Sequence, residues 1–116
     1  MRKEGGAKVI NFIENKLPPK LRGSRLIALK AEDHYVHIYT ENGTEMILMK
    51  FEDAVQALSS YNGVITHRSW WIALDAIRSI ERTSAGFNVT LDKGLIVPVS
   101  RRRKAAMKAI RDLNKS

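Results

Sequence analysis

The sequence has no cysteine, so neither disulfide bonds nor thiolate metal ligands can stabilise its fold. It has no apolar run near the roughly 18 residues that a membrane-spanning helix needs, and Met1–Gly6 lacks the apolar core of a signal peptide. His34 and His37 are the only neighbouring histidines, and their i,i+3 spacing puts them on opposite faces of a strand. We therefore expect a cytoplasmic protein without a metal or another cofactor.

The composition of the 116 residues, 44% hydrophobic and 28% charged, is that of one soluble globular domain. The net charge of +8 is distributed unevenly along the chain. Residues 1–58 carry 9 Lys or Arg against 8 Asp or Glu, whereas residues 59–116 carry 11 against 4. This asymmetry favours a polyanionic partner, either nucleic acid or an acidic membrane surface, although solvated lysines alone would give the same charge.

The N-terminal segment differs in pattern from the rest of the chain. Residues 7–16 place apolar side chains at helical spacing, and Pro18 and Pro19 end that helix because proline cannot continue the hydrogen-bond ladder. The chain therefore divides into an N-terminal helix and arm, residues 1–25, and a main domain, residues 26–116.

The main domain shows the pattern of short strands joined by turns. An Asn-Gly turn at Asn42–Gly43 and a turn at Asp92–Gly94 each predict a hairpin. The expected strands cover residues 26–29, 35–40, 44–50, 64–66, 78–82, 87–91 and 95–99, with helices over residues 51–60 and 101–113. The predicted class is mostly β with minor α.

Four consecutive cations, Arg101–Lys104, follow a good N-cap residue, Ser100. In the first turn of the last helix each cation costs roughly 0.3–1 kcal/mol, because the helix N-terminus is already partly positive. An anion such as phosphate would compensate this cost. We expect Arg102 to contact DNA, because it does not belong to the stripe of basic residues along this helix. The stripe itself is equally well explained as a solvated helix face. That stripe comprises Arg101, Lys104, Lys108, Arg111 and Lys115.

A second unusual segment contains two adjacent tryptophans. Trp70 and Trp71 are large enough to supply core area, and the alternative is that one of them stacks on a base. Arg68 and Ser69 precede them and have no apolar role. The arginine fork matches either the guanine O6/N7 edge or a phosphate.

The acids Glu32 and Asp33 precede His34 in a predicted loop between two strands. Asp33 and His34 could form half of a hydrolytic dyad, with Ser69 or Ser100 as nucleophile. However, the sequence has no G-x-S-x-G elbow, paired-carboxylate cleft or glycine-rich phosphate loop. We do not expect an enzyme.

Three motifs in this order resemble the LytTR family of DNA-binding domains. They are Ala-Glu-Asp-His-Tyr-Val at residues 31–36, Thr-His-Arg-Ser-Trp-Trp at 66–71 and Val-Pro-Val-Ser-Arg-Arg-Arg at 97–103, within a similarity over residues 20–112. The resemblance implies elongated, stacked antiparallel sheets of about ten short strands with little helix. It also implies a response-regulator type transcription factor whose loops enter successive major grooves and bend the DNA.

The resemblance assigns base contacts to His34, Arg68 and Arg102. It assigns DNA backbone contacts to Ser69, Ser100, Arg101, Arg103 and Lys104. The implied partner is double-stranded DNA with repeated sites, often bound by two domains, which is compatible with a homodimer on DNA. Such domains usually follow a receiver domain, a membrane segment or another sensor, so an excised effector domain and a stand-alone regulator both remain open.

Two other functions fit the residues. An RNA- or single-strand-binding β-domain would use Trp70 or Trp71 as a stacking platform. A protein-interaction or dimerisation module would use the amphipathic helix over residues 7–16 as its contact.

Overall fold

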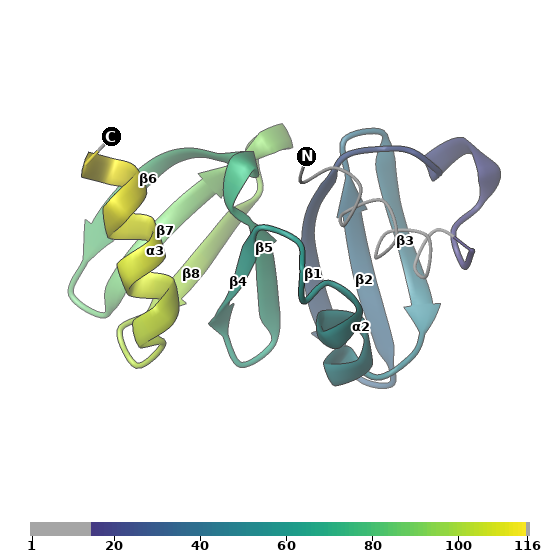
Figure 1. Ribbon diagram of the computed structural model, residues 1–116, viewed down its shortest axis with the longest axis horizontal. Coiled ribbons are helices and arrows are strands. Elements are labelled where there is room, and N and C mark those ends of the chain that lie inside the picture. Colours follow the sequence, from purple (N-terminus) through teal and green to yellow (C-terminus); the bar gives the residue numbers. More distant parts are fainter. Residues whose placement is uncertain (1–14, 116) are drawn as a thin grey trace.

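The computed structural model describes residues 15–115, and Figure 1 shows two sheets side by side with a helix in front of each. Within these residues eight strands form a five-stranded and a three-stranded antiparallel sheet. The mostly-β class is confirmed, with eight described strands in place of about ten. The helix expected over residues 7–16 lies almost entirely outside the described residues.

The five-stranded sheet has the strand order β3-β2-β1-β5-β4. β2 shows why the residues form strands: Val36, Ile38 and Thr40 alternate with more exposed side chains, so one face of the strand is buried. The strands are β1 (Leu26–Glu32), β2 (Tyr35–Thr40), β3 (Gly43–Leu48), β4 (Gly63–His67) and β5 (Trp70–Ala73).

The three-stranded sheet has the order β6-β7-β8, and its β8 edge lies beside β4 of the larger sheet. Its strands are β6 (Ile77–Thr83), β7 (Gly86–Leu91) and β8 (Ile96–Ser100). Short 3₁₀ turns connect or precede the strands: η1 (Pro19–Leu21), η2 (Leu74–Ala76) and η3 (Asp92–Gly94).

Two α-helices cover the sheets. α2 (Phe51–Ala57) packs on the larger sheet through Ala54, and α3 (Lys104–Lys115) packs over the β4–β8 seam through Ala106 and Ile110. These side chains belong to one continuous buried cluster that also contains residues of both sheets. The two sheets and both helices therefore share a single core.

The boundaries depart from the sequence expectations most clearly in four places. β1 continues to Glu32 rather than ending at residue 29. Residues 70–73 form β5, which was not predicted, because Trp70 and Trp71 were interpreted only as core or base-stacking residues. α2 ends at Ala57 rather than at residue 60. α3 begins at Lys104 rather than at residue 101. The hairpin at Asn42–Gly43 is confirmed, with Gly43 as the first residue of β3.

Candidate nucleic-acid interface

Three turns from distant parts of the sequence lie along one edge of the molecule, the lower edge in Figure 1. They are the β1–β2 turn at Asp33–His34, the β4–β5 turn at Arg68–Ser69 and the β8–α3 connection at Arg101–Arg103. β1 and β4 both end at this edge because each is antiparallel to β5. We call these three segments together the contact edge. It contains most of the residues that the sequence singled out for DNA, and the other two, Ser100 and Lys104, directly flank its third segment.

The β8–α3 connection is a turn held by three backbone donors. The Arg102 N–H donates to Ser100 Oγ over 3.1 Å, and the Arg103 N–H donates to the Ser100 carbonyl over 3.0 Å. The Arg101 N–H donates to the Ala85 carbonyl over 3.1 Å, which attaches the connection to the β6–β7 turn. Arg101 and Arg102 are exposed and Arg103 is half-buried.

This geometry corrects the expected role of Ser100. Its hydroxyl oxygen accepts a hydrogen bond within the preceding turn and does not cap the helix, whose first turn begins at Lys104. Arg101, Arg102 and Arg103 therefore precede the helix, and the cost of placing cations in its first turn applies to Lys104 alone among these four. The basic stripe is only partly on α3: Lys104, Lys108 and Arg111 are exposed there, and Lys108 pairs with Asp112.

The β4–β5 turn consists of Arg68 and Ser69. The Ser69 carbonyl accepts a hydrogen bond of 2.8 Å from the Ala31 N–H, so β1 fixes this turn from the side. Arg68 is exposed, whereas Ser69 is half-buried. The arginine can thus reach outward from a turn whose backbone is held in place.

The two tryptophans after this turn have different environments. Trp71 is only 3% exposed and belongs to the core, as expected for one of the pair. Trp70 is half-buried; its ring stacks with that of Tyr39 at 5.8 Å and lies 5.4 Å from the Lys30 ammonium. Trp71 cannot stack on a base in this fold, and Trp70 already packs within the protein.

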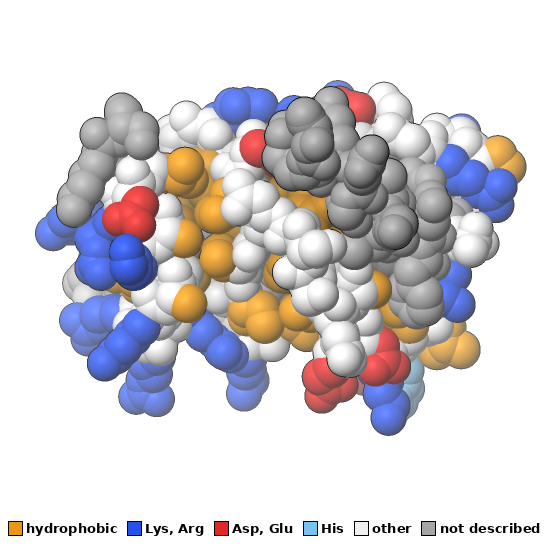
Figure 2. Space-filling view, in the orientation of Figure 1, with side chains coloured by type: hydrophobic (Ala, Val, Ile, Leu, Met, Phe, Trp, Pro, Cys, Tyr) orange, Lys and Arg blue, Asp and Glu red, His pale blue; other side chains and the backbone are white. Residues whose placement is uncertain are grey.

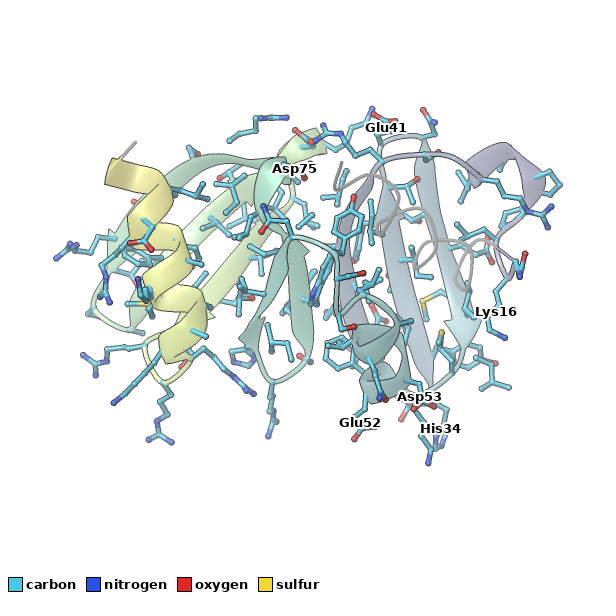
Figure 3. The ribbon with its side chains drawn as sticks, in the orientation of Figure 1. Lys16, His34, Glu41, Glu52, Asp53 and Asp75 are labelled. Carbon is cyan, nitrogen blue, oxygen red and sulfur yellow. The ribbon has the colours of Figure 1, made fainter. Side chains whose placement is uncertain are left out.

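The β1–β2 turn presents His34 at the far end of the contact edge (Figure 3). Asp33 adopts a left-handed conformation with φ of 60°, which aspartate tolerates better than most residues. The His34 carbonyl accepts a hydrogen bond of 3.2 Å from the Met49 N–H, which connects the turn to the segment before α2. The His34 side chain is exposed.

A surface groove of about 990 Å³ runs along the contact edge and joins its three segments. His34, Arg68 and Arg103 all line it, while its apolar lining comes from α2, from the end of β3 and the residue after it, and from single residues of β1 and β4. Lys50, also exposed on its rim, was missed by the sequence analysis because it belongs to none of the three motifs. The sequence indicated only that Lys50 ends a predicted strand directly before a predicted helix.

Charge is distributed unevenly along the contact edge. Figure 2 shows Lys and Arg side chains along the edge below α3, and acidic side chains gathered below α2. Figure 3 places Glu52 and Asp53 beside His34. The arginine end is therefore suited to attract phosphates, whereas the acids beside His34 weaken that attraction at the other end.

The family model of the LytTr DNA-binding domain matches residues 10–112 of the chain. Among solved structures, the chain resembles the LytTr DNA-binding domain of a protein described as a methyl-accepting/DNA response regulator from Bacillus cereus. The TM-score is 0.65 at 22% sequence identity, over 73% of this chain and 79% of that one. None of the curated proteins compared with the chain matches it.

The fold and the family match together define a DNA-binding domain and not an enzyme. The chain belongs to the LytTr DNA-binding domain family, as its motifs predicted. This family fits transcription regulation of the response-regulator type. In the part of the chain that the structure describes, no helix has the length and apolarity needed to cross a membrane.

Proposed function

We propose that this domain binds double-stranded DNA sequence-specifically through the contact edge and thereby regulates transcription. The observation that carries the proposal is the convergence of three separate turns on one edge, each with an exposed side chain suited to a base or a phosphate. His34, Arg68 and Arg102 contact bases in this arrangement. The backbone contacts come from Ser69, Ser100, Arg101, Arg103 and Lys104.

The dimensions of the molecule agree with contacts in successive major grooves. The longest dimension is 39 Å and runs along the contact edge in Figure 1. Successive major grooves on one side of B-DNA are about 34 Å apart. A domain lying along the duplex can therefore place its two ends in neighbouring grooves, and bending of the DNA would bring the middle of the edge closer to the backbone.

Two of the three proposed base contacts are arginines in turns with fixed backbones. A guanidinium offers paired donors that match guanine O6 and N7, and exposed Arg68 and Arg102 can each present them. His34 supplies a smaller donor or acceptor at the end of the edge where acids weaken phosphate attraction. We expect His34 to contribute more to discrimination than to affinity.

The phosphate contacts follow from the β8–α3 connection. Lys104 begins a helix, so its cation and the free N–H groups of the first turn both favour an anion there. The Ser100 oxygen accepts the Arg102 N–H, which leaves its hydroxyl proton available to donate to a phosphate. We propose that the chain binds repeated sites, two copies to a promoter, as the resemblance of its motifs implies.

The test begins with selection of preferred duplexes from a random library by the full chain. On the selected site we expect Arg68→Ala and Arg102→Ala each to weaken binding by roughly 5- to 150-fold and to relax one base position. Lys104→Ala should instead weaken all duplexes alike and reduce the salt slope by about 1. Lys20→Ala, an exposed lysine on η1 before the start of β1, is the matched control.

Two outcomes would overturn the proposal. Equal binding to all duplexes, lost with added salt, would leave only a non-specific electrostatic attraction. Tighter binding to single strands than to duplex, with quenching of tryptophan fluorescence by poly-dT, would favour the single-strand function.

A further inference from the structure

Charged side chains from five segments meet at the edge opposite the contact edge. Arg25, just before β1, donates from Nη2 to Asp92 Oδ2 over 2.6 Å. The other carboxylate oxygen of Asp92 accepts a hydrogen bond from Nε of Arg78 on β6. Asp92 lies in η3, between β7 and β8, and its side chain is only 13% exposed. One carboxylate therefore connects the start of the larger sheet to the smaller sheet.

The same arginine is also held from within the larger sheet. The backbone N–H of Arg25 donates to Glu41 Oε2 over 3.0 Å, and Glu41 belongs to the β2–β3 turn. The Arg25 guanidinium also lies 3.7 Å from the carboxylate of Asp75 in η2, the segment that joins the two sheets in sequence. Figure 3 shows Glu41 and Asp75 together along this upper edge.

The two sheets have no common strand ladder. β4 and β8 lie side by side but belong to different hydrogen-bonded sheets. The contact edge nevertheless combines both sheets: Arg68 belongs to the larger one, whereas Arg102 follows the last strand of the smaller one. The separation of these two arginines therefore depends on how one sheet sits against the other.

We propose that the Arg25–Asp92–Arg78 bridge fixes the relative placement of the two sheets and thereby sets the DNA spacing that the domain accepts. This inference rests on the proposed function. Asp92 is a positioning residue, because it lies at the opposite edge and acts through the orientation of Arg68 and Arg102. Arg25 and Arg78 are 35% and 55% exposed, but the carboxylate that joins them is only 13% exposed, so two charge-assisted hydrogen bonds fix its position between them.

The diagnostic change is Asp92→Asn, which keeps the side-chain shape but removes the charge that both arginines require. Glu41→Gln is the matched control, since it alters a contact of Arg25 that stays within the larger sheet. Asp92→Glu restores the carboxylate and should restore the wild-type behaviour.

The first measurement is affinity for the selected duplex and for the same duplex with one base pair inserted between the Arg68 and Arg102 contacts. We expect the insertion to weaken wild-type binding by about tenfold. In Asp92→Asn it should weaken binding by less than about threefold, with unchanged affinity for random duplex. A general loss of folding would lower both affinities and would not flatten the spacing preference.

The second measurement requires no DNA. Because the chain lacks cysteine, spin labels on the exposed positions Thr44→Cys in β3 and Ser79→Cys in β6 report the separation of the two sheets. We expect a broader distance distribution in Asp92→Asn and an unchanged one in Glu41→Gln.

An unchanged distribution or an intact spacing preference in Asp92→Asn would overturn the inference. If the wild-type chain selected no duplex, the proposed function would fail instead. The inference about DNA spacing would then fail with it. A broader spin-label distance distribution in Asp92→Asn would still support the bridge as the contact that positions the two sheets.

Discussion

Gly63 offers a sharp test of how the core supports the contact edge. It is the first residue of β4, and its backbone has an ordinary conformation, so its lack of a side chain matters for space and not for φ. A Cβ there would lie 2.6 Å from the Ile72 carbonyl oxygen and closer still to Cζ2 of Trp71. Neither obstacle can move easily, because one is backbone in β5 and the other is a buried ring.

We expect Gly63→Ala to destabilise the fold by about 3 kcal/mol, the upper part of the range for inserting a methyl group into a packed core. For 116 residues the entropy of unfolding is about 0.24 kcal/mol/K. The melting temperature should therefore fall by about 12 °C. β4 leads directly into the Arg68 turn, so affinity for the selected duplex should fall as well.

Calorimetry of wild type and variant measures the change. Gly94→Ala is the control: a Cβ there meets nothing within 4 Å, but φ of 77° imposes backbone strain. The substitution Trp71→Phe replaces the indole with a smaller ring. Combined with Gly63→Ala, it should recover part of the lost stability; combined with Gly94→Ala, it should recover none. A Gly63→Ala variant within about 1 kcal/mol of wild type would refute the reasoning.

Two further predictions concern charge and pH. Combining Glu52→Gln with Asp53→Asn should raise the affinity for random duplex by up to about fivefold per charge and lower the ratio of specific to random binding. Titration at two salt concentrations measures both quantities. An unchanged affinity for random duplex would contradict the charge argument. Burial raises the pKa of both Tyr39 and Tyr61 above the ordinary 10.0, so their contribution to stability is complete below pH 10 and is lost as the pH rises through the raised values. The melting temperature should thus fall above pH 10, and it should fall less steeply with pH in the double variant Tyr39→Phe/Tyr61→Phe. An equal fall in wild type and double variant would show that these tyrosines do not cause the pH dependence.

The sequence predicted the elements whose pattern is local. β-branched and aromatic residues identify β2 at Tyr35–Thr40, with the same bounds in the structure, where one of its faces is buried and the other is not. β5 escaped prediction because its two tryptophans were interpreted as core or base-stacking residues, and its place between β1 and β4 depends on the order of the strands. The helix start was misplaced because Ser100 is as good a residue for a turn as for a cap, and only the hydrogen-bond partner distinguishes these roles.

The candidate site was predictable as three separate segments but not as a surface. Each motif spans a turn. The placement of charge indicated Arg68 and Arg102, whereas His34 was assigned by the resemblance of the motifs to the LytTR family. The order of the strands in the sheets then decides that these turns share one edge. The acids beside His34 come from the start of α2, and the total charge of the N-terminal half gave no indication of their place.

The bridge between Arg25, Asp92 and Arg78 could not be predicted from the sequence, because the fold alone brings its residues together. Arg25 and Asp92 are 67 positions apart, and neither stands out among the 20 basic and 12 acidic residues of the chain. Their importance arises from the seam, where the two sheets meet through side-chain packing and this bridge and not through a shared ladder. Substitutions in this bridge leave the three turn motifs intact. We expect them to change the accepted spacing of DNA contacts more than substitutions of the arginines that touch the bases.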